Sequence, residues 1–252
     1  MTGTTAEFPK FPPGLWRRIV LDPHPHWIGA ALEDDLHRFN LRIDHSDGCI
    51  ARVTAQALRT PWTECGGAAG FIAAELTGEL LEDVARRDPY QHCTHLLDLA
   101  ILASAHAGDT AQTTFDMRVA DRVDERTTAT FSRDGEEMLR WQLDGTLVVG
   151  GPQDGLNLRK LSQWKSELPA EEAEQATVLR RAIYISGGRQ FTPPPGLHAV
   201  DMGPQRMGVC FNYQLPQAES STRTEGWRKD FSESGDTPLA DFNPDGAFAE
   251  MA

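Results

Sequence analysis

Three short segments of the chain concentrate side chains that bind metals in proteins. Residues 34–37 read Asp-Asp-Leu-His, residue 65 is a cysteine, and residues 92–95 read His-Cys-Thr-His. Imidazole, thiolate and carboxylate groups are the usual protein ligands of zinc, and iron(II) accepts a similar set. These segments therefore predict a metal site, provided that the fold brings them together.

Two of the four cysteines lie where we expect helices to begin, at Cys65 and Cys93. The free N–H groups and the dipole at a helix start favour thiolate over thiol, so each can act as a ligand or a nucleophile. Cys49 and Cys210 lie inside expected strands. We interpret these two as packing residues, because free cysteine behaves as a small hydrophobic side chain.

The predicted ligands are His37, Cys65, Cys93 and one of His92 and His95. Their donor atoms should lie within about 4 Å of one another around a tetrahedral ion, zinc being expected and iron the alternative. Four protein ligands would make the ion structural. Three ligands and a water molecule would make it a Lewis acid. The histidine that does not bind is then free to act as an acid or a base.

Several polar and aromatic residues border the same segments. Asp34, Asp35 and Glu64 are spare carboxylates, and we expect Asp35, Glu64 and His92 as the catalytic acid–base groups. Arg59 and Trp62 are expected to hold a substrate carboxylate and an aromatic or acyl group. The alternative for Arg59 is an internal ion pair, and for Trp62 a place in the core.

The composition limits the classes of partner that we expect. The 252 residues carry a formal net charge of −13, which repels phosphate backbones and anionic membranes, so we expect neither as a partner. Residues 1–7 lack a basic region followed by an apolar one, and no run approaches a membrane span. We expect a cytoplasmic protein with reduced thiols and a small-molecule substrate, and association of like chains stays open.

The elements expected from periodicity and from turn and capping residues form an α+β fold. The strands are 15–21, 28–34, 36–44, 49–58, 113–120, 126–133, 137–143 and 208–215, and the helices are 63–78, 80–87, 94–106 and 169–185. Residues 1–27 are expected as an arm, 28–110 as a small sheet with helices on one face, 111–216 as an antiparallel meander with one long helix, and 217–252 as a polar tail.

Three motifs resemble the hallmarks of a bacterial protein family of unknown function. They are E-D-D-x-H over residues 33–37, R-x-P-W-x-x-C over residues 59–65 and C-T-H-L over residues 93–96. The resemblance covers most of the chain. It implies that the three segments belong to one site, and it favours His95 over His92 as the ligand.

Residues 30–107 are remotely similar to the U-type scaffold proteins of iron–sulfur cluster assembly. The shared pattern is a strand pair with the Asp47-Gly48 turn, a helix beginning at Cys65 and a buried helix beginning at His92-Cys93. His37 stands where that family has a cysteine, and Phe39 stands where it has the aspartate that makes its cluster labile. These departures imply a permanent metal rather than a delivered cluster.

Three functions follow from these observations. The first is a metal-dependent lyase, hydrolase or isomerase that acts on a small organic substrate, with aromatic and carboxylate-bearing compounds among the options. The second is a metal or iron–sulfur carrier or assembly protein with a structural zinc. The third is a metal-free enzyme with a Cys–His nucleophile. We favour the first, because a second half of over 100 residues is more than a carrier needs.

Overall fold

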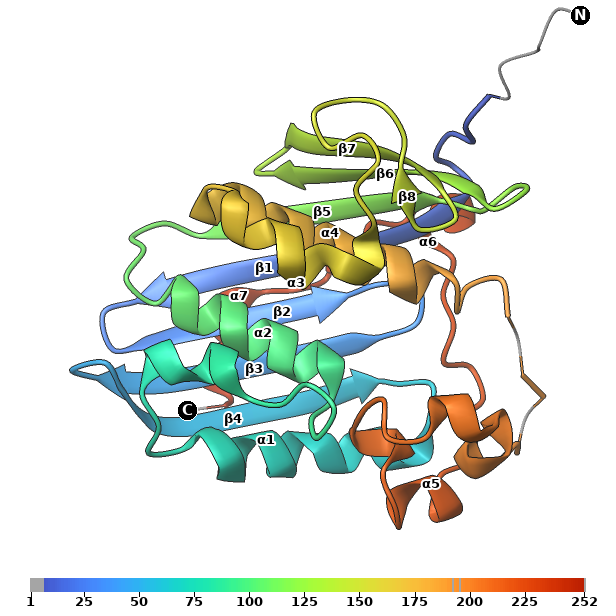
Figure 1. Cartoon of the computed structure of the whole chain (residues 1–252). Coiled ribbons are helices and arrows are strands. Elements are labelled where there is room, and N and C mark those ends of the chain that lie inside the picture. The colour runs from blue at the N-terminus through green and yellow to red at the C-terminus, as the bar shows by residue number, and fades with distance from the viewer. Residues whose placement is uncertain (1–6, 192, 195, 252) are drawn as a thin grey trace, which may run out of the picture. The chain divides into compact units, whose positions relative to one another are not determined.

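A computed structural model describes residues 7–191, 193–194 and 196–251. It confirms a fold of mixed helices and antiparallel strands, in which hydrogen bonds join eight strands in the order β4-β3-β2-β1-β5-β6-β7-β8 (Figure 1). The strands are β1 (Gly14–His24), β2 (Trp27–Glu33), β3 (Arg38–Ser46), β4 (Cys49–Arg59), β5 (Thr113–Ala120), β6 (Arg126–Arg133), β7 (Glu136–Asp144) and β8 (Leu147–Val148).

The α-helices are α1 (Ala68–Leu76), α2 (Thr94–Ala105), α3 (Leu161–Trp164), α4 (Ala170–Ser186), α5 (Gln217–Ser220), α6 (Phe231–Ser234) and α7 (Pro244–Ala249). The 3-10 helices are η1 (Thr63–Gly67), η2 (Leu81–Arg86), η3 (Leu158–Lys160), η4 (Lys165–Glu167), η5 (Ala199–Met202), η6 (Pro204–Arg206) and η7 (Phe211–Tyr213). In the part of the chain that the structure describes, no helix is both long enough and apolar enough to cross a membrane.

The chain divides into two compact units, and each is assembled from separate stretches of sequence. The first unit contains residues 1–18, 115–192 and 230–238, and the second contains residues 19–114, 193–229 and 239–252. These boundaries differ from the ranges expected from the sequence. β1 lies inside the expected arm, and the expected polar tail supplies α5, α6 and α7.

In the second unit, β2, β3 and β4 form an antiparallel meander with the predicted turn between β3 and β4. Ser46 pairs with Cys49, and the two turn residues Asp47 and Gly48 have φ angles of 51° and 77°. Positive φ at both central positions is the geometry that an Asp-Gly hairpin turn supplies. This confirms the turn as the sequence predicts it.

Helices cover one face of this meander, and a C-terminal segment covers the other (Figure 1). α1 packs against β4, while α2 packs against β2 and β3. On the opposite face the Phe248 ring lies against Gly29, where a Cβ atom would overlap the ring. Phe248 belongs to a buried apolar cluster with Val20, Ala31, Leu239 and Met251, so residues of the expected polar tail complete the core.

In the first unit, β5, β6 and β7 form the predicted meander, and α4 packs against β6 and β7. Arg189 holds the 230–238 segment in this unit, because its guanidinium pairs with Asp121 at 3.0 Å and with Asp230 at 2.7 Å. A cavity of about 470 Å³ lies between β7 and α4, lined by Trp141, Trp164, Gln175 and other residues of the unit. None of the predicted site residues lines it.

The expected strand over 208–215 is wrong. Gly208 has a φ of +75°, and the segment turns back on itself through η7, so that the Gly208 N–H donates to the Tyr213 carbonyl at 2.9 Å. The prediction of a single helix in the second half is also incomplete, because the short helix α3 precedes α4.

The closure of the sheet face by Phe248 gives a stability prediction. Phe248→Ala should lower the free energy of unfolding by about 3–5 kcal/mol, because a fully buried ring is lost and leaves a cavity over Gly29. Urea denaturation measures this. Phe191→Ala is the matched control, since Phe191 is 51% exposed, and it should change stability by less than about 0.5 kcal/mol. Equal effects of the two variants would contradict the packing described.

Candidate functional site

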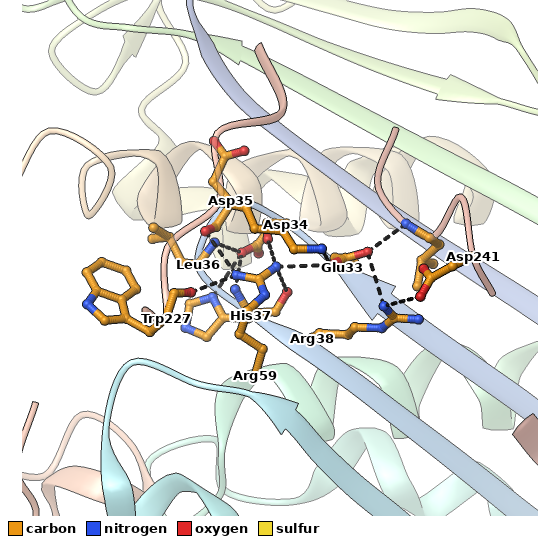
Figure 2. A network of polar contacts seen from close by, with 11 residues as sticks. Glu33, Asp34, Asp35, Leu36, His37, Arg38, Arg59, Trp227 and Asp241 are labelled. Atoms are coloured by element: carbon orange, nitrogen blue, oxygen red, sulfur yellow. Dashed lines mark hydrogen bonds and ion pairs between the residues drawn. The ribbon is translucent and has the colours of Figure 1, made fainter. Parts of the chain in front are cut away.

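The site is built around the turn that joins β2 to β3, and the guanidinium of Arg59 holds this turn from inside (Figure 2). Nη2 donates to the carbonyl of Asp34 at 2.6 Å and to the Glu33 carboxylate at 3.1 Å. Nη1 donates to the carbonyl of Asp35 at 3.0 Å and to that of Trp227 at 2.8 Å. Arg59 thereby joins the turn to a segment far away in the sequence.

The Asp34 carboxylate shapes the turn and orients His37. Its Oδ1 accepts hydrogen bonds from the backbone N–H groups of Leu36 and His37, each at 2.8 Å, and lies 3.1 Å from His37 Nδ1. An ionised carboxylate only accepts hydrogen bonds, so this contact fits an imidazole that carries a proton on Nδ1. The contact orients the His37 ring beside the carboxylate.

His95 completes the group from the first turn of α2. Its ring centroid lies 3.8 Å from that of His37, and the two ring planes are inclined by 33°. Among the described residues, Asp34, His37 and His95 each offer one potential ligand atom, and these atoms lie within 4.8 Å of one another. The structure therefore places two imidazoles and one carboxylate together.

This group overlaps with the predicted ligand set only in part. It contains His37 and His95, and Cys93 borders it, with Sγ 3.9 Å from His95 Nδ1. Cys65 is not a member of the group. Asp34 is the member that the ligand prediction missed, because it was placed among the spare carboxylates. The signal that could have found it is its three-residue spacing to His37, which an aspartate-capped turn requires.

Three cysteines from three segments gather beside this group. Cys65 in η1 and Cys210 pack against the same apolar cluster as Trp62 and Tyr213. The Phe211 N–H donates to the His92 carbonyl at 3.0 Å, which brings residue 210 beside Cys93. Cys210 is thus a neighbour of Cys65 and Cys93, although the sequence favoured a separate packing role for it.

In the chain without an ion, burial opposes the thiolate form that the helix starts are expected to favour. Burial raises the pKa of Cys93 to about 12. Burial, followed by the neighbouring Cys93 and Cys210, raises the pKa of Cys65 well above its usual value. The cost of burying an uncompensated negative charge exceeds what the N–H groups of one helical turn return. Burial thus favours the thiol form of both groups in the chain without an ion.

The three predicted acid–base residues do not gather in the Asp34–His37–His95 group. His92 is buried beside Phe71, and its Nδ1 has no hydrogen-bond partner among the residues that the structure describes. Burial lowers its pKa, opposed by Glu75. Asp35 is buried, and its carboxylate points away from Arg59 in Figure 2. Glu64 is half-buried in η1.

The predicted substrate-binding residues have structural contacts. The Nη atoms of Arg59 donate to the carbonyls of the turn and of Trp227. Arg59 therefore has an internal role, which is the alternative expected for it. Trp62 is 4% exposed and packs edge-on against Tyr213 with ring centroids 5.8 Å apart, so it belongs to the core.

Comparison of the chain with protein-family models gives no match, and a search of curated proteins gives none either.

The contacts of Arg59 predict that it stabilises the fold rather than binding substrate. Arg59→Lys should lower the free energy of unfolding by about 2–4 kcal/mol, because an ammonium cannot reproduce the fork of donors that reaches four backbone carbonyls. Thermal and urea denaturation measure this. Arg86→Lys, an exposed control, should stay within about 0.5 kcal/mol of the parent. Unchanged stability of Arg59→Lys would restore the substrate-binding role.

Proposed function

We propose that the chain is a metal-dependent enzyme acting on a small organic substrate, with a divalent ion held by Asp34, His37 and His95. The observation that supports this most directly is the convergence of three ligand atoms within 4.8 Å of one another. They come from a tight turn and from the first turn of a buried helix, and both are fixed by the core. Ligands held in this way lose little conformational entropy when an ion binds.

The donor set favours a catalytic ion over a structural one. Structural zinc is generally closed by four cysteine or histidine ligands, whereas catalytic zinc has three protein ligands and an open position. Two imidazoles and one carboxylate fit the open type, and the same set suits iron(II). Zinc is the ion we propose and iron the alternative. When bound, such an ion polarises a substrate oxygen or supplies hydroxide near neutral pH.

The chain's own residues set up this site. Asp34 Oδ1 lies 3.1 Å from His37 Nδ1, and Arg59 donates to the carbonyls of Asp34 and His37. The reaction classes that a redox-inert Lewis acid supports are lyase, hydrolase and isomerase chemistry, which is why we place the protein among them.

The two resemblances stay predictions, and they favour different functions. The family with the E-D-D-x-H motif is consistent with a site at Asp34 and His37. The iron–sulfur scaffolds bind their cargo through cysteines, and the gathering of Cys65, Cys93 and Cys210 is the feature that favours a carrier. Metal binding by variants of each group separates these proposals.

Metal analysis of purified variants tests the proposed ion. The parent chain should bind one equivalent of zinc. Asp34→Asn, His37→Ala and His95→Ala should each weaken binding about a hundredfold or more, because each removes one of three ligands. Calorimetric titration measures this. His106→Ala is the matched control, since His106 lies at the other end of α2 and contacts Asp109.

Cobalt(II) spectra of the same proteins identify the donors. A site of Asp34, His37 and His95 should give no thiolate-to-cobalt charge-transfer band, and Cys65→Ser should retain the ion. A strong charge-transfer band that disappears in Cys65→Ser, with binding unchanged in Asp34→Asn, would contradict the proposal and support the carrier.

The contact of 3.9 Å between Cys93 Sγ and His95 Nδ1 favours one further candidate, a metal-free enzyme with a Cys–His nucleophile. Burial opposes this candidate, because a pKa of about 12 leaves very little thiolate at neutral pH.

Alkylation of the metal-free chain by iodoacetamide, followed by mass spectrometry, tests the reactivity of Cys93. We expect Cys93 to react more slowly than Cys49, the control, whose thiol lies in a more exposed position at the start of β4. Rapid and selective alkylation of Cys93 that is lost in His95→Phe would support the nucleophile.

A further inference from the structure

One arginine of the second unit is held between two indole rings. The guanidinium carbon of Arg223 lies 3.7 Å from the ring centroid of Trp227 and 5.0 Å from that of Trp62. The backbone is fixed as well, since residue 223 forms a bridge with Trp62 and its N–H donates to the Leu197 carbonyl at 3.0 Å. Aromatic faces on a guanidinium stabilise the cation and restrict its rotamers.

Arg223 has no carboxylate partner among the residues that the structure describes. Its side chain forms no ion pair or hydrogen bond with them, and Nε is enclosed without a partner. The chain carries 37 acidic against 24 basic residues, so acidic partners are plentiful. Buried or half-buried cations in proteins are generally paired, and an unpaired one has a desolvation cost that a bound anion can offset.

The surroundings of Arg223 are aromatic and lie beside the cysteines. Burial lowers the pKa of Arg223 to about 10, opposed by Tyr213 and Cys65, so the group stays charged at neutral pH. Tyr213 stands edge-on to Trp62, and both are more than nine-tenths buried. Cys65 is a neighbour of Cys93, and the thiol of Cys93 lies 3.9 Å from His95 Nδ1.

We propose that Arg223, held between Trp62 and Trp227, binds the carboxylate of a small organic ligand. A guanidinium presents two parallel N–H donors that match the two oxygens of a carboxylate. The indole rings fix the orientation of the guanidinium that would meet this carboxylate. Its place in catalysis rests on the proposed function, in which the carboxylate would anchor a substrate of the ion at Asp34, His37 and His95.

This assignment moves the anion-binding role from Arg59 to Arg223. The Nη donors of Arg59 already reach backbone carbonyls and Glu33, so a substrate would compete with the fold for them. Arg223 offers a charged group that no carboxylate among the described residues neutralises. A carboxylate is favoured over phosphate because phosphate sites generally combine several cations or a helix N-terminus, and a single guanidinium suits a single negative charge.

Titration of the metal-free full-length chain with sodium benzoate tests the proposal. The ¹⁵N–¹H signal of Arg223 Nε, assigned by its loss in Arg223→Gln, should shift in a saturable way with benzoate. Benzamide, which is neutral and has the same shape, should cause no such shift. Arg223→Gln should weaken benzoate binding about tenfold or more, because a charge-assisted pair is lost, and Arg223→Lys should lie between it and the parent. Arg86→Gln, which changes an exposed arginine, should bind like the parent.

Three results would overturn the proposal. They are the absence of a saturable shift with benzoate in the parent chain, equal binding of benzoate and benzamide, and tighter binding of inorganic phosphate than of benzoate. If Arg223→Gln fails to fold, the Nε signal is assigned by its loss in Arg223→Lys. The titration of the parent chain with benzoate then tests the proposal by itself. Because no metal is present in this experiment, its outcome is independent of the metal-binding variants that test the proposed function.

Discussion

The second unit depends on one largely buried cation, the guanidinium of Arg59. Its donors reach the carbonyls of Asp34, Asp35, His37 and Trp227 and the carboxylate of Glu33. A tight turn between two buried strands leaves several carbonyls without strand partners, and water cannot reach them there. One planar group with donors on two sides compensates them together. The orientation of His37 follows from the turn that Arg59 holds.

Polar groups of the site therefore have two kinds of partner. The Glu33 carboxylate forms ion pairs with Arg59 and Lys229 and accepts a hydrogen bond from the N–H of Leu239. Its charge is therefore balanced by residues from distant segments. Arg223, in contrast, is balanced among the described residues by indole faces alone. A cation without a carboxylate partner has a small desolvation cost only if its aromatic contacts are good and a ligand or water binds its remaining N–H donors. This difference separates residues that hold the fold from one that can receive a ligand.

Much of the fold could be predicted from the sequence where the signal is local. The bounds of β5 and β6 follow from alternation and turn residues, α2 follows from its apolar stripe, and the Asp47-Gly48 turn follows from the need for positive φ. The strand expected over 208–215 failed because Gly208 and the turn at η7 override the apolar pattern. The partners of the C-terminal segment could not be predicted, since Phe248 meets Gly29 only through tertiary packing.

The candidate site shows the same division. The sequence identified the three segments and brought His37 and His95 into one group, because residue type and position at element ends are visible in it. Whether a thiol ionises depends on burial, which no single segment determines, and the burial that opposes thiolates at Cys65 and Cys93 is not visible in the sequence. Arg59 and Arg223 look alike in the sequence, and only their neighbours in the fold distinguish them.

The covering of the sheet by Phe248 also bears on how the chain is made. The N–H of Leu239 and the carboxylate of Glu33 are joined across 206 residues, and the Phe248 carbonyl and Arg42 across the same separation. During synthesis β2 and β3 emerge long before the ring that closes over Gly29, so an apolar face stays in contact with solvent for most of translation. Such late closure slows folding and exposes the nascent sheet to other chains. Expression of this protein should accordingly be more sensitive to chaperone capacity and to the temperature of growth than its native stability would suggest.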